Sequence, residues 1–91
     1  MLKMRVSVPT DILIRELDSE AVLLNLKSER YFGLDKVGTS MWMALCKFES
    51  ITSAYEVLKT EYDVDADLLR KDLNALVEKL VNHGLLEFSG G

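Results

Sequence analysis

The sequence predicts one α+β domain in which a three-stranded antiparallel sheet is followed by three helices. Two observations favour this order. The first third of the chain carries short runs of bulky apolar residues separated by polar turns, whereas the other two thirds carry apolar residues at helical spacing. The length of 91 residues suits a single modest core. We therefore expect residues 1–91 to form one domain.

The β region begins with a short extended lead-in at residues 6–8, directly before the single proline of the chain. Residues 12–17 and 21–26 are rich in apolar side chains, and the polar segment 18–20 between them has the length of a hairpin connection. Residues 30–34 follow a polar turn and contain aromatic and bulky side chains. They are expected to return antiparallel as the third and last strand of the sheet.

The alternation of side chains predicts which strand faces are buried. In the second strand, Val22, Leu24 and Leu26 share one face because side chains alternate with period two. In the third strand, Phe32 and Leu34 share a face for the same reason. We expect both faces to meet the helices.

Two helices are expected in the middle of the chain. The first covers about residues 36–47, with Asp35 as its N-cap. The second opens at Ser50 or Thr52 and ends near Glu61. Each has an apolar stripe at helical spacing. The stripe residues are Val37, Met41, Trp42, Leu45 and Phe48 in the first helix, and Ile51, Ala54, Tyr55, Leu58 and Tyr62 in the second.

The third helix is the longest, from about residue 65 to residue 83, and Gly84 is placed to end it as a C-cap glycine. Residues 85–88 are expected to add a last short strand, and residues 90–91 to be loose. The core stripe of the third helix consists of Leu69, Leu73, Leu76, Val77 and Leu80.

Composition and charge narrow the classes of function. The formal net charge of −4 disfavours general binding to nucleic acid or to anionic membranes. No apolar run reaches the roughly 20 residues that cross a bilayer, and the start of the chain lacks the apolar run of a signal peptide. A single cysteine, Cys46, forms no internal disulfide. We expect a cytoplasmic protein.

The order of elements is winged helix-turn-helix-like, which raises the alternative of a DNA-binding or transcription-accessory module. The third helix would then enter a major groove. Its side chains are poorly suited to that role, because the basic residues are offset by acidic ones. The polar and basic residues are Arg70, Lys71, Asn74 and Lys79, and the acidic ones are Asp65, Asp67, Asp72 and Glu78.

The third strand is expected to lie at the edge of the sheet. An edge strand leaves one row of backbone N–H and C=O groups unpaired, and such an edge is either protected or used to capture an extended peptide. We favour capture. A further interpretation is a structural subunit whose edge strand pairs with its own copy, which would give a homodimer.

Several stretches together resemble the PqqD-like family, which includes coenzyme PQQ synthesis protein D and the recognition elements for ribosomally made precursor peptides. They are Leu23-Leu24-Asn25-Leu26, the run from Arg30 to Asp35 with Gly38, Met41 and Trp42, and the ending Asn82-His83-Gly84-Leu85-Leu86 with Leu73 and Leu76. The resemblance covers residues 11–88. Within the family, the chain is more similar to the stand-alone recognition proteins of lasso-peptide or similar pathways. It departs from the PQQ branch in the turn before the third strand.

The resemblance implies a non-catalytic protein that binds the leader part of a precursor peptide. The leader would join the third strand as a further antiparallel strand, in a groove beside the third helix. It would then be presented to a modifying enzyme, either a radical SAM enzyme or a leader peptidase or cyclase. The expected peptide-binding residues are Arg30, Tyr31, Phe32, Gly33, Leu68, Leu69, Asp72, Leu73, Leu76 and Lys79.

Each of these residues also has a plain structural explanation. Phe32, Leu69, Leu73 and Leu76 are of the type that fills a core, whereas charged residues usually face solvent. His83 is explained as a cation-capable residue at a helix C-terminus. The chain shows no grouping of nucleophile, base and orienting residue, no phosphate loop and no metal-ligand spacing. We expect no catalytic residue, no metal and no cofactor.

Overall fold

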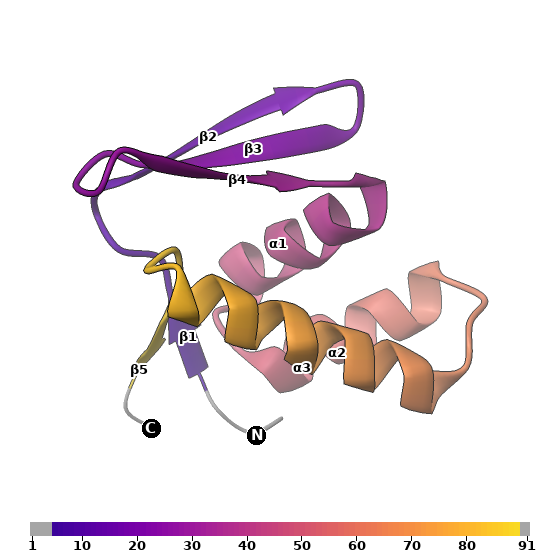
Figure 1. Cartoon of the computed structure of the whole chain (residues 1–91). Helices are drawn as coiled ribbons and strands as arrows, with labels where there is room; N and C mark the ends of the chain where they lie inside the picture. Colours follow the sequence, from indigo (N-terminus) through magenta and orange to yellow (C-terminus); the bar gives the residue numbers. More distant parts are fainter. Residues whose placement is uncertain (1–4, 90–91) are drawn as a thin grey trace.

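The computed structural model describes residues 5–89, which form five strands and three helices (Figure 1). The β-strands are β1 (Arg5–Ser7), β2 (Ile12–Leu17), β3 (Glu20–Asn25), β4 (Arg30–Leu34) and β5 (Glu87–Ser89), and the helices are α1 (Lys36–Phe48), α2 (Ile51–Glu61) and α3 (Ala66–Asn82).

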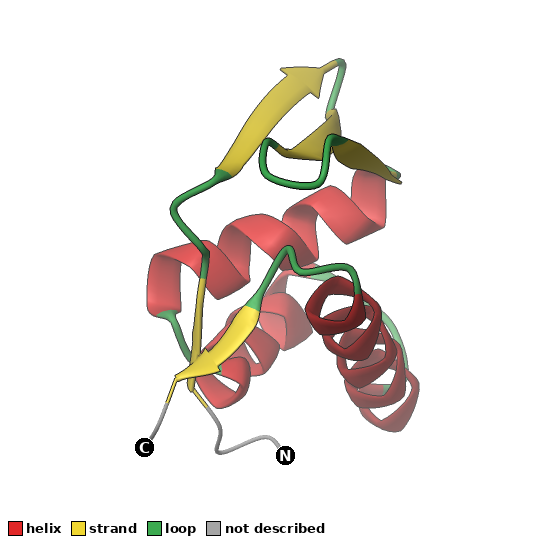
Figure 2. Cartoon of the chain, turned by 60° about the vertical axis from the view of Figure 1, so that its left-hand side comes forward, coloured by secondary structure: helices red, strands yellow, loops and turns green. Residues whose placement is uncertain are grey.

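The described strands form two sheets. Strands β2, β3 and β4 make an antiparallel sheet in that order, and the helices lie on one side of it (Figure 2). This confirms the predicted α+β fold with a three-stranded sheet followed by three helices. The lead-in strand and the last strand are also present, as β1 and β5, and they pair with each other as a separate two-stranded sheet. The expected loose end at residues 90–91 lies outside the described residues.

The hairpin between β2 and β3 is tighter than expected. Its connection consists of Asp18 and Ser19, both with positive φ (49° and 71°), and Glu20 already belongs to β3, opposite Leu17. A two-residue loop with positive φ at both positions matches the right-handed twist of the flanking strands. The predicted three-residue connection was therefore too long by one residue.

The buried face of β3 is the opposite of the one expected. Ala21 and Leu23 are buried against the helices, whereas Val22 is 41% exposed on the far side of the sheet and Leu26 is 55% exposed beyond the end of β3. The pairing of β3 with β4 explains this result, since Leu23 lies opposite Phe32 and shares its face. The prediction for β4 was correct, because Leu34 is buried and Phe32 packs against the core.

Local capping fixes the helix ends close to their predicted positions. The Asp35 side chain accepts a hydrogen bond from the backbone N–H of Gly38 (2.7 Å), and Ser50 caps α2 through the N–H of Ser53 (3.3 Å). Asp65 accepts from the N–H of Asp67 (2.8 Å) at the start of α3. Gly84 follows α3 with a φ of 71°, a conformation that favours glycine.

The core lies between the sheet and the helices. Every described element except β2 and β5 contributes buried apolar residues, and so does the segment between α3 and β5. These residues are Val6, Ala21, Leu23, Leu34, Met41, Trp42, Ala44, Leu45, Ile51, Ala54, Leu58, Leu69, Leu73, Val77, Leu80, Leu85 and Leu86. Val37 does not belong to this core as the helical spacing suggested, because it is 46% exposed. Leu76 is partly buried at the margin of the core.

Candidate functional site

Strand β4 has an open edge. Within residues 5–89 it pairs with β3 alone, so its other side presents backbone N–H and C=O groups of alternate residues to solvent. The edge is not shielded by a bulge or a proline, two of the devices that prevent a strand from pairing with another chain. This edge can therefore accept one further strand.

The side chains of β4 differ on its two faces. Tyr31 is 76% exposed on the face away from the helices, and Gly33 shares this face with open space around the position of a side chain. Phe32 is half-buried on the helix side, and Arg30 is exposed. A peptide strand beside β4 would thus meet a mainly apolar surface on the helix side and a tyrosine on the other.

One face of α3 is directed at β4. The ring of His83, at the C-terminal end of α3, meets the ring of Phe32 edge-on, with centroids 5.1 Å apart and an interplanar angle of 67°. Residues at positions 68, 72, 76 and 79 share this side of the helix with residue 83, because they are spaced three or four residues apart. The expected residues Leu68, Asp72, Leu76 and Lys79 therefore lie on the side of α3 that faces β4.

We call this surface the β4–α3 face: the open edge of Arg30–Leu34 together with Leu68, Asp72, Leu76 and Lys79. Leu68, Asp72 and Lys79 are exposed and Leu76 is half-buried. Leu69 and Leu73 were also expected to contact a peptide, but they are 4% and 0% exposed and hold α3 against the core.

The end of the β4–α3 face near Arg30 is where the end of α3 meets the sheet. His83 Nδ1 lies 2.7 Å from the carbonyl oxygen of Lys79, so this ring nitrogen carries the proton of the hydrogen bond. The Asn25 side chain donates to the carbonyl oxygen of Gly84 at 3.4 Å. The first bond holds the His83 ring against the last turn of α3, and the second joins β3 to the turn that follows α3.

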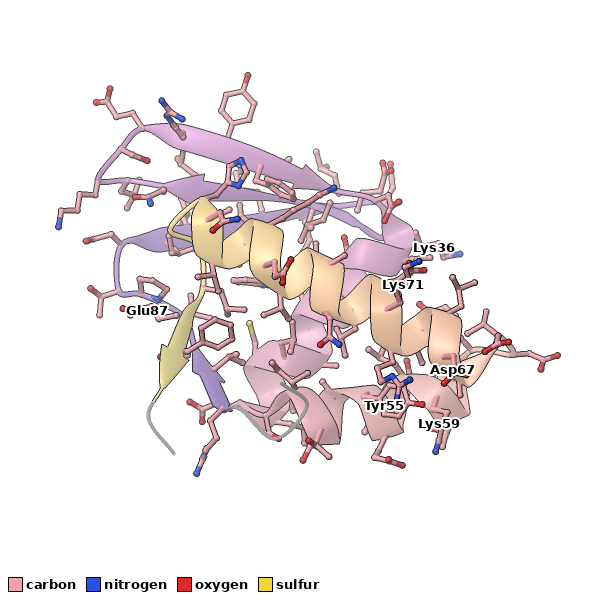
Figure 3. The ribbon with its side chains drawn as sticks, turned by 60° about the horizontal axis from the view of Figure 1, so that its bottom comes forward. Lys36, Tyr55, Lys59, Asp67, Lys71 and Glu87 are labelled. Carbon is pink, nitrogen blue, oxygen red and sulfur yellow. The ribbon has the colours of Figure 1, made fainter. Side chains whose placement is uncertain are left out.

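The other end of the face holds a small apolar pocket of about 80 Å³. It opens where α1 begins, and Lys36 and Lys71 mark this end in Figure 3. The pocket lies between the start of α1, the loop after α2 and the start of α3. Its lining residues are Val37, Met41, Tyr62, Val64, Leu68, Leu69 and Asp72.

Sequence reasoning missed five of the residues at these two ends: His83, Val37, Met41, Tyr62 and Val64. His83 lies four residues after Lys79, so the spacing of the α3 residues would have indicated it. Val64 is an isolated apolar residue between two aspartates and is 50% exposed, which is an unusual place for valine. Val37, Met41 and Tyr62 gave no such signal, because all three also fit the core stripes of their helices.

The described residues offer no metal site, since residues 5–89 contain no group of three or more His, Cys, Asp or Glu side chains close enough to hold an ion. Cys46 is half-buried, and burial, reinforced by the negative charge of Glu49, raises its pKa from the ordinary value of 9.0 to about 11. A thiol with such a pKa is a poor nucleophile. Among the described helices, none is both long and apolar enough to cross a membrane.

Comparison with known proteins identifies the family. The family model for coenzyme PQQ synthesis protein D (PqqD) matches residues 20–86, which include β3, β4 and all three helices of the described chain. The chain belongs to the PqqD family. The search of curated proteins found no match to this PqqD-family chain.

Two solved structures resemble this PqqD-family protein over nearly its whole length. TbiB1 in complex with the TbiA(beta) leader peptide is 30% identical and has a TM-score of 0.84, with 93% of this chain and 99% of TbiB1 covered. A lasso peptide synthetase B1 complexed with the leader peptide has a TM-score of 0.80 at 24% identity, with 91% of this chain and 98% of that protein covered. The second match shows the shared fold.

Proposed function

We propose that this PqqD-family protein is a non-catalytic binding protein that captures the leader of a ribosomally made precursor peptide. The observation that carries the proposal is the open edge of β4 beside the exposed side of α3. The family match and the likeness to TbiB1, which was solved with a leader peptide, support it. The same observations do not favour the DNA-binding alternative, and on α3 Arg70 is paired with Asp67 at 3.1 Å.

The leader binds as an additional antiparallel strand along β4. A strand of about five residues forms several backbone hydrogen bonds, each contributing roughly 0.5–1.5 kcal/mol net. These bonds do not depend on the leader sequence, so specificity comes from side chains. Alternate leader residues point to the helix side, toward Phe32 and α3, or to the other side, toward Tyr31 and Gly33.

The apolar pocket at the start of α3 accepts one leader side chain as an anchor. Its volume of about 80 Å³ suits a small or medium apolar group, and Leu68 and Val37 at its rim are half-exposed before binding. Charge contributes less to leader affinity, because charges of opposite sign lie together here and offset one another. Asp72 lines the pocket, and Lys36 and Lys71 lie at the same end of the face. A dissociation constant near micromolar, about −8 kcal/mol, is expected after ordering costs.

The direction of β4 sets the path of the bound peptide. An antiparallel leader enters beside Leu34, near the pocket, and leaves beside Arg30 and His83. The part of the precursor that follows the leader therefore emerges at the end of the sheet that carries the β3–β4 turn.

The bound leader tethers the rest of the precursor close to a separate enzyme. Tethering turns the encounter of enzyme and substrate into an effectively intramolecular one, with local concentrations up to millimolar. We propose that the enzyme is a radical SAM enzyme or a leader peptidase or cyclase, and that both proteins act in the cytoplasm. This protein supplies recognition, and the chemistry belongs to the enzyme.

A calorimetric titration tests the function. The probe is the synthetic leader of a precursor peptide encoded beside the gene of this protein, and the control is a scrambled peptide of the same composition. We expect saturable binding of the true leader at micromolar concentration and at least about tenfold weaker binding of the scrambled peptide. Equal binding of both peptides, or no binding of either at about 500 µM, would exclude sequence-specific leader capture.

A further inference from the structure

The β2–β3–β4 sheet has a second face that the described helices do not cover, since α1, α2 and α3 all lie on its other side (Figures 1 and 2). The strand register sets out this outer face in three cross-strand rows. The rows are Leu13, Leu24 and Tyr31; Arg15, Val22 and Gly33; and Leu17 with Glu20.

The outer face is largely apolar although it is exposed. Leu17 and Tyr31 are 74% and 76% exposed, Leu13 is 47% exposed and Val22 is 41% exposed. Strands that are apolar on both sides are typical of sheets covered on both faces. Contiguous exposed apolar surface on a small soluble protein indicates an interaction site. We therefore expect a binding partner other than residues 5–89 to cover the outer face of the sheet.

The charges on the outer face are self-complementary. Arg15 and Glu20 are diagonal neighbours on adjacent strands, and both are exposed. Neither forms an ion pair within residues 5–89, where the pairs are Lys59 with Glu56 and Arg70 with Asp67. One positive and one negative group thus flank the apolar centre without an ion-pair partner among residues 5–89.

We propose that the outer face binds a second copy of this chain in a two-fold symmetric, face-to-face dimer. A two-fold axis that lies in the plane of the interface and is the perpendicular bisector of the line from Arg15 to Glu20 places each arginine opposite the glutamate of the other copy. With strands about 4.8 Å apart and same-face residues about 7 Å apart along a strand, Leu17 and Val22 then lie close to the axis. Each of them meets its own counterpart, so one placement satisfies both the charges and the apolar centre.

The dimer is expected to be weak and to leave the β4 edge free. Three strands of five or six residues span only about 20 by 15 Å, or roughly 300 Å² of flat area on each copy, which is below the roughly 800 Å² per partner of stable specific interfaces. We therefore expect dissociation constants of about 10 to 100 µM. Because the interface centres on Leu17 and Val22 and not on the edge of β4, it goes beyond leader capture and does not depend on it.

The test is sedimentation velocity of the purified chain from about 5 to 500 µM. We expect a concentration-dependent dimer that is weakened at least about tenfold by Val22→Glu, because residue 22 meets its own counterpart at the axis and the substitution brings two negative charges together there. Met43→Glu is the matched control, because Met43 is 44% exposed on α1, away from the sheet's outer face. Circular dichroism checks that both variants are folded.

A charge-reversal cycle identifies the partner as a second copy. Arg15→Glu and Glu20→Arg each place like charges opposite one another twice, so each variant alone is expected to associate at least about tenfold more weakly. When the two variants are mixed, the facing charges are opposite again, and we expect the dimer to return. A pairing within one chain cannot produce this rescue.

Three results would overturn the proposal. The chain would remain monomeric at all concentrations, the dimer would persist in Val22→Glu as it does in the control, or mixing the two charge variants would restore nothing. The last two results would point to a different dimer contact, such as pairing of the β4 edges. Leader titration of Val22→Glu separates this question from the proposed function, because leader affinity is expected to stay within about twofold of the parent.

Discussion

Replacing Leu68 with alanine is expected to weaken leader binding about 4- to 15-fold. Leu68 is 53% exposed at the rim of the pocket on α3, so a bound leader has about half of its side chain left to cover. Full burial of a leucine side chain contributes about 1.5–3 kcal/mol, and the exposed 53% of that is about 0.8–1.6 kcal/mol. Each 1.4 kcal/mol changes a dissociation constant about tenfold.

Fluorescence anisotropy of a labelled leader measures this effect, with Met43→Ala as the control. Met43 has a similar exposure, 44%, but lies on the part of α1 that lines a different cavity, next to Lys47 and Phe48. The reasoning would be refuted if Leu68→Ala bound the leader as tightly as the parent while remaining folded. It would also be refuted if Met43→Ala lost as much affinity, because the loss would then not come from the pocket.

Three more predictions concern the edge, the charges and the thiol. A leader with proline at the residue whose N–H pairs with Tyr31 or Gly33 should bind at least about tenfold more weakly, since one backbone bond is lost and the ring disturbs the ladder; anisotropy showing unchanged affinity would sink strand addition. Charge reversal at Asp72 or Lys79 should change affinity less than about threefold at physiological salt, because both side chains are exposed; a larger, salt-insensitive loss would mean that a buried ion pair forms. Alkylation of Cys46 at pH 8 should be slow, because raising its pKa from 9.0 to about 11 lowers the thiolate fraction about 100-fold; a rate equal to that of a free thiol, followed by mass spectrometry, would contradict this.

The helix boundaries could be predicted from the sequence because their signals are local. Asp35 and Asp65 cap neighbouring N–H groups, and Gly84 takes the positive φ that ends α3. Each signal lies within a few residues of the boundary that it sets. The predicted and observed helices therefore differ by only one or two residues at their ends.

The buried face of β3 could not be predicted in this way. Apolar residues occupy both of its faces, so the alternation that usually marks the core side is absent. The pairing with β4 determines which face of β3 is buried, because it places Leu23 opposite Phe32 and leaves Val22 on the outer face. The same ambiguity explains why the exposed apolar outer face was not foreseen.

The candidate site was predictable in part. The edge position of β4 follows from the order of strands along the chain, and Leu68, Asp72 and Lys79 follow from helical spacing. The depth of Leu73 and the pocket between α1 and α3 depend on how the helices pack, which no local pattern in the sequence encodes.

The central claim is that the leader binds as a strand on β4, and hydrogen exchange of backbone amides with and without saturating leader tests it most directly. The account predicts that alternate amides of Arg30–Leu34 become protected from exchange. It also predicts that the amide chemical shifts of the α3 residues near Leu68 and Lys79 change. Binding that leaves every β4 amide exchanging at its free rate, or that protects amides only in α1 and α2, would contradict strand addition.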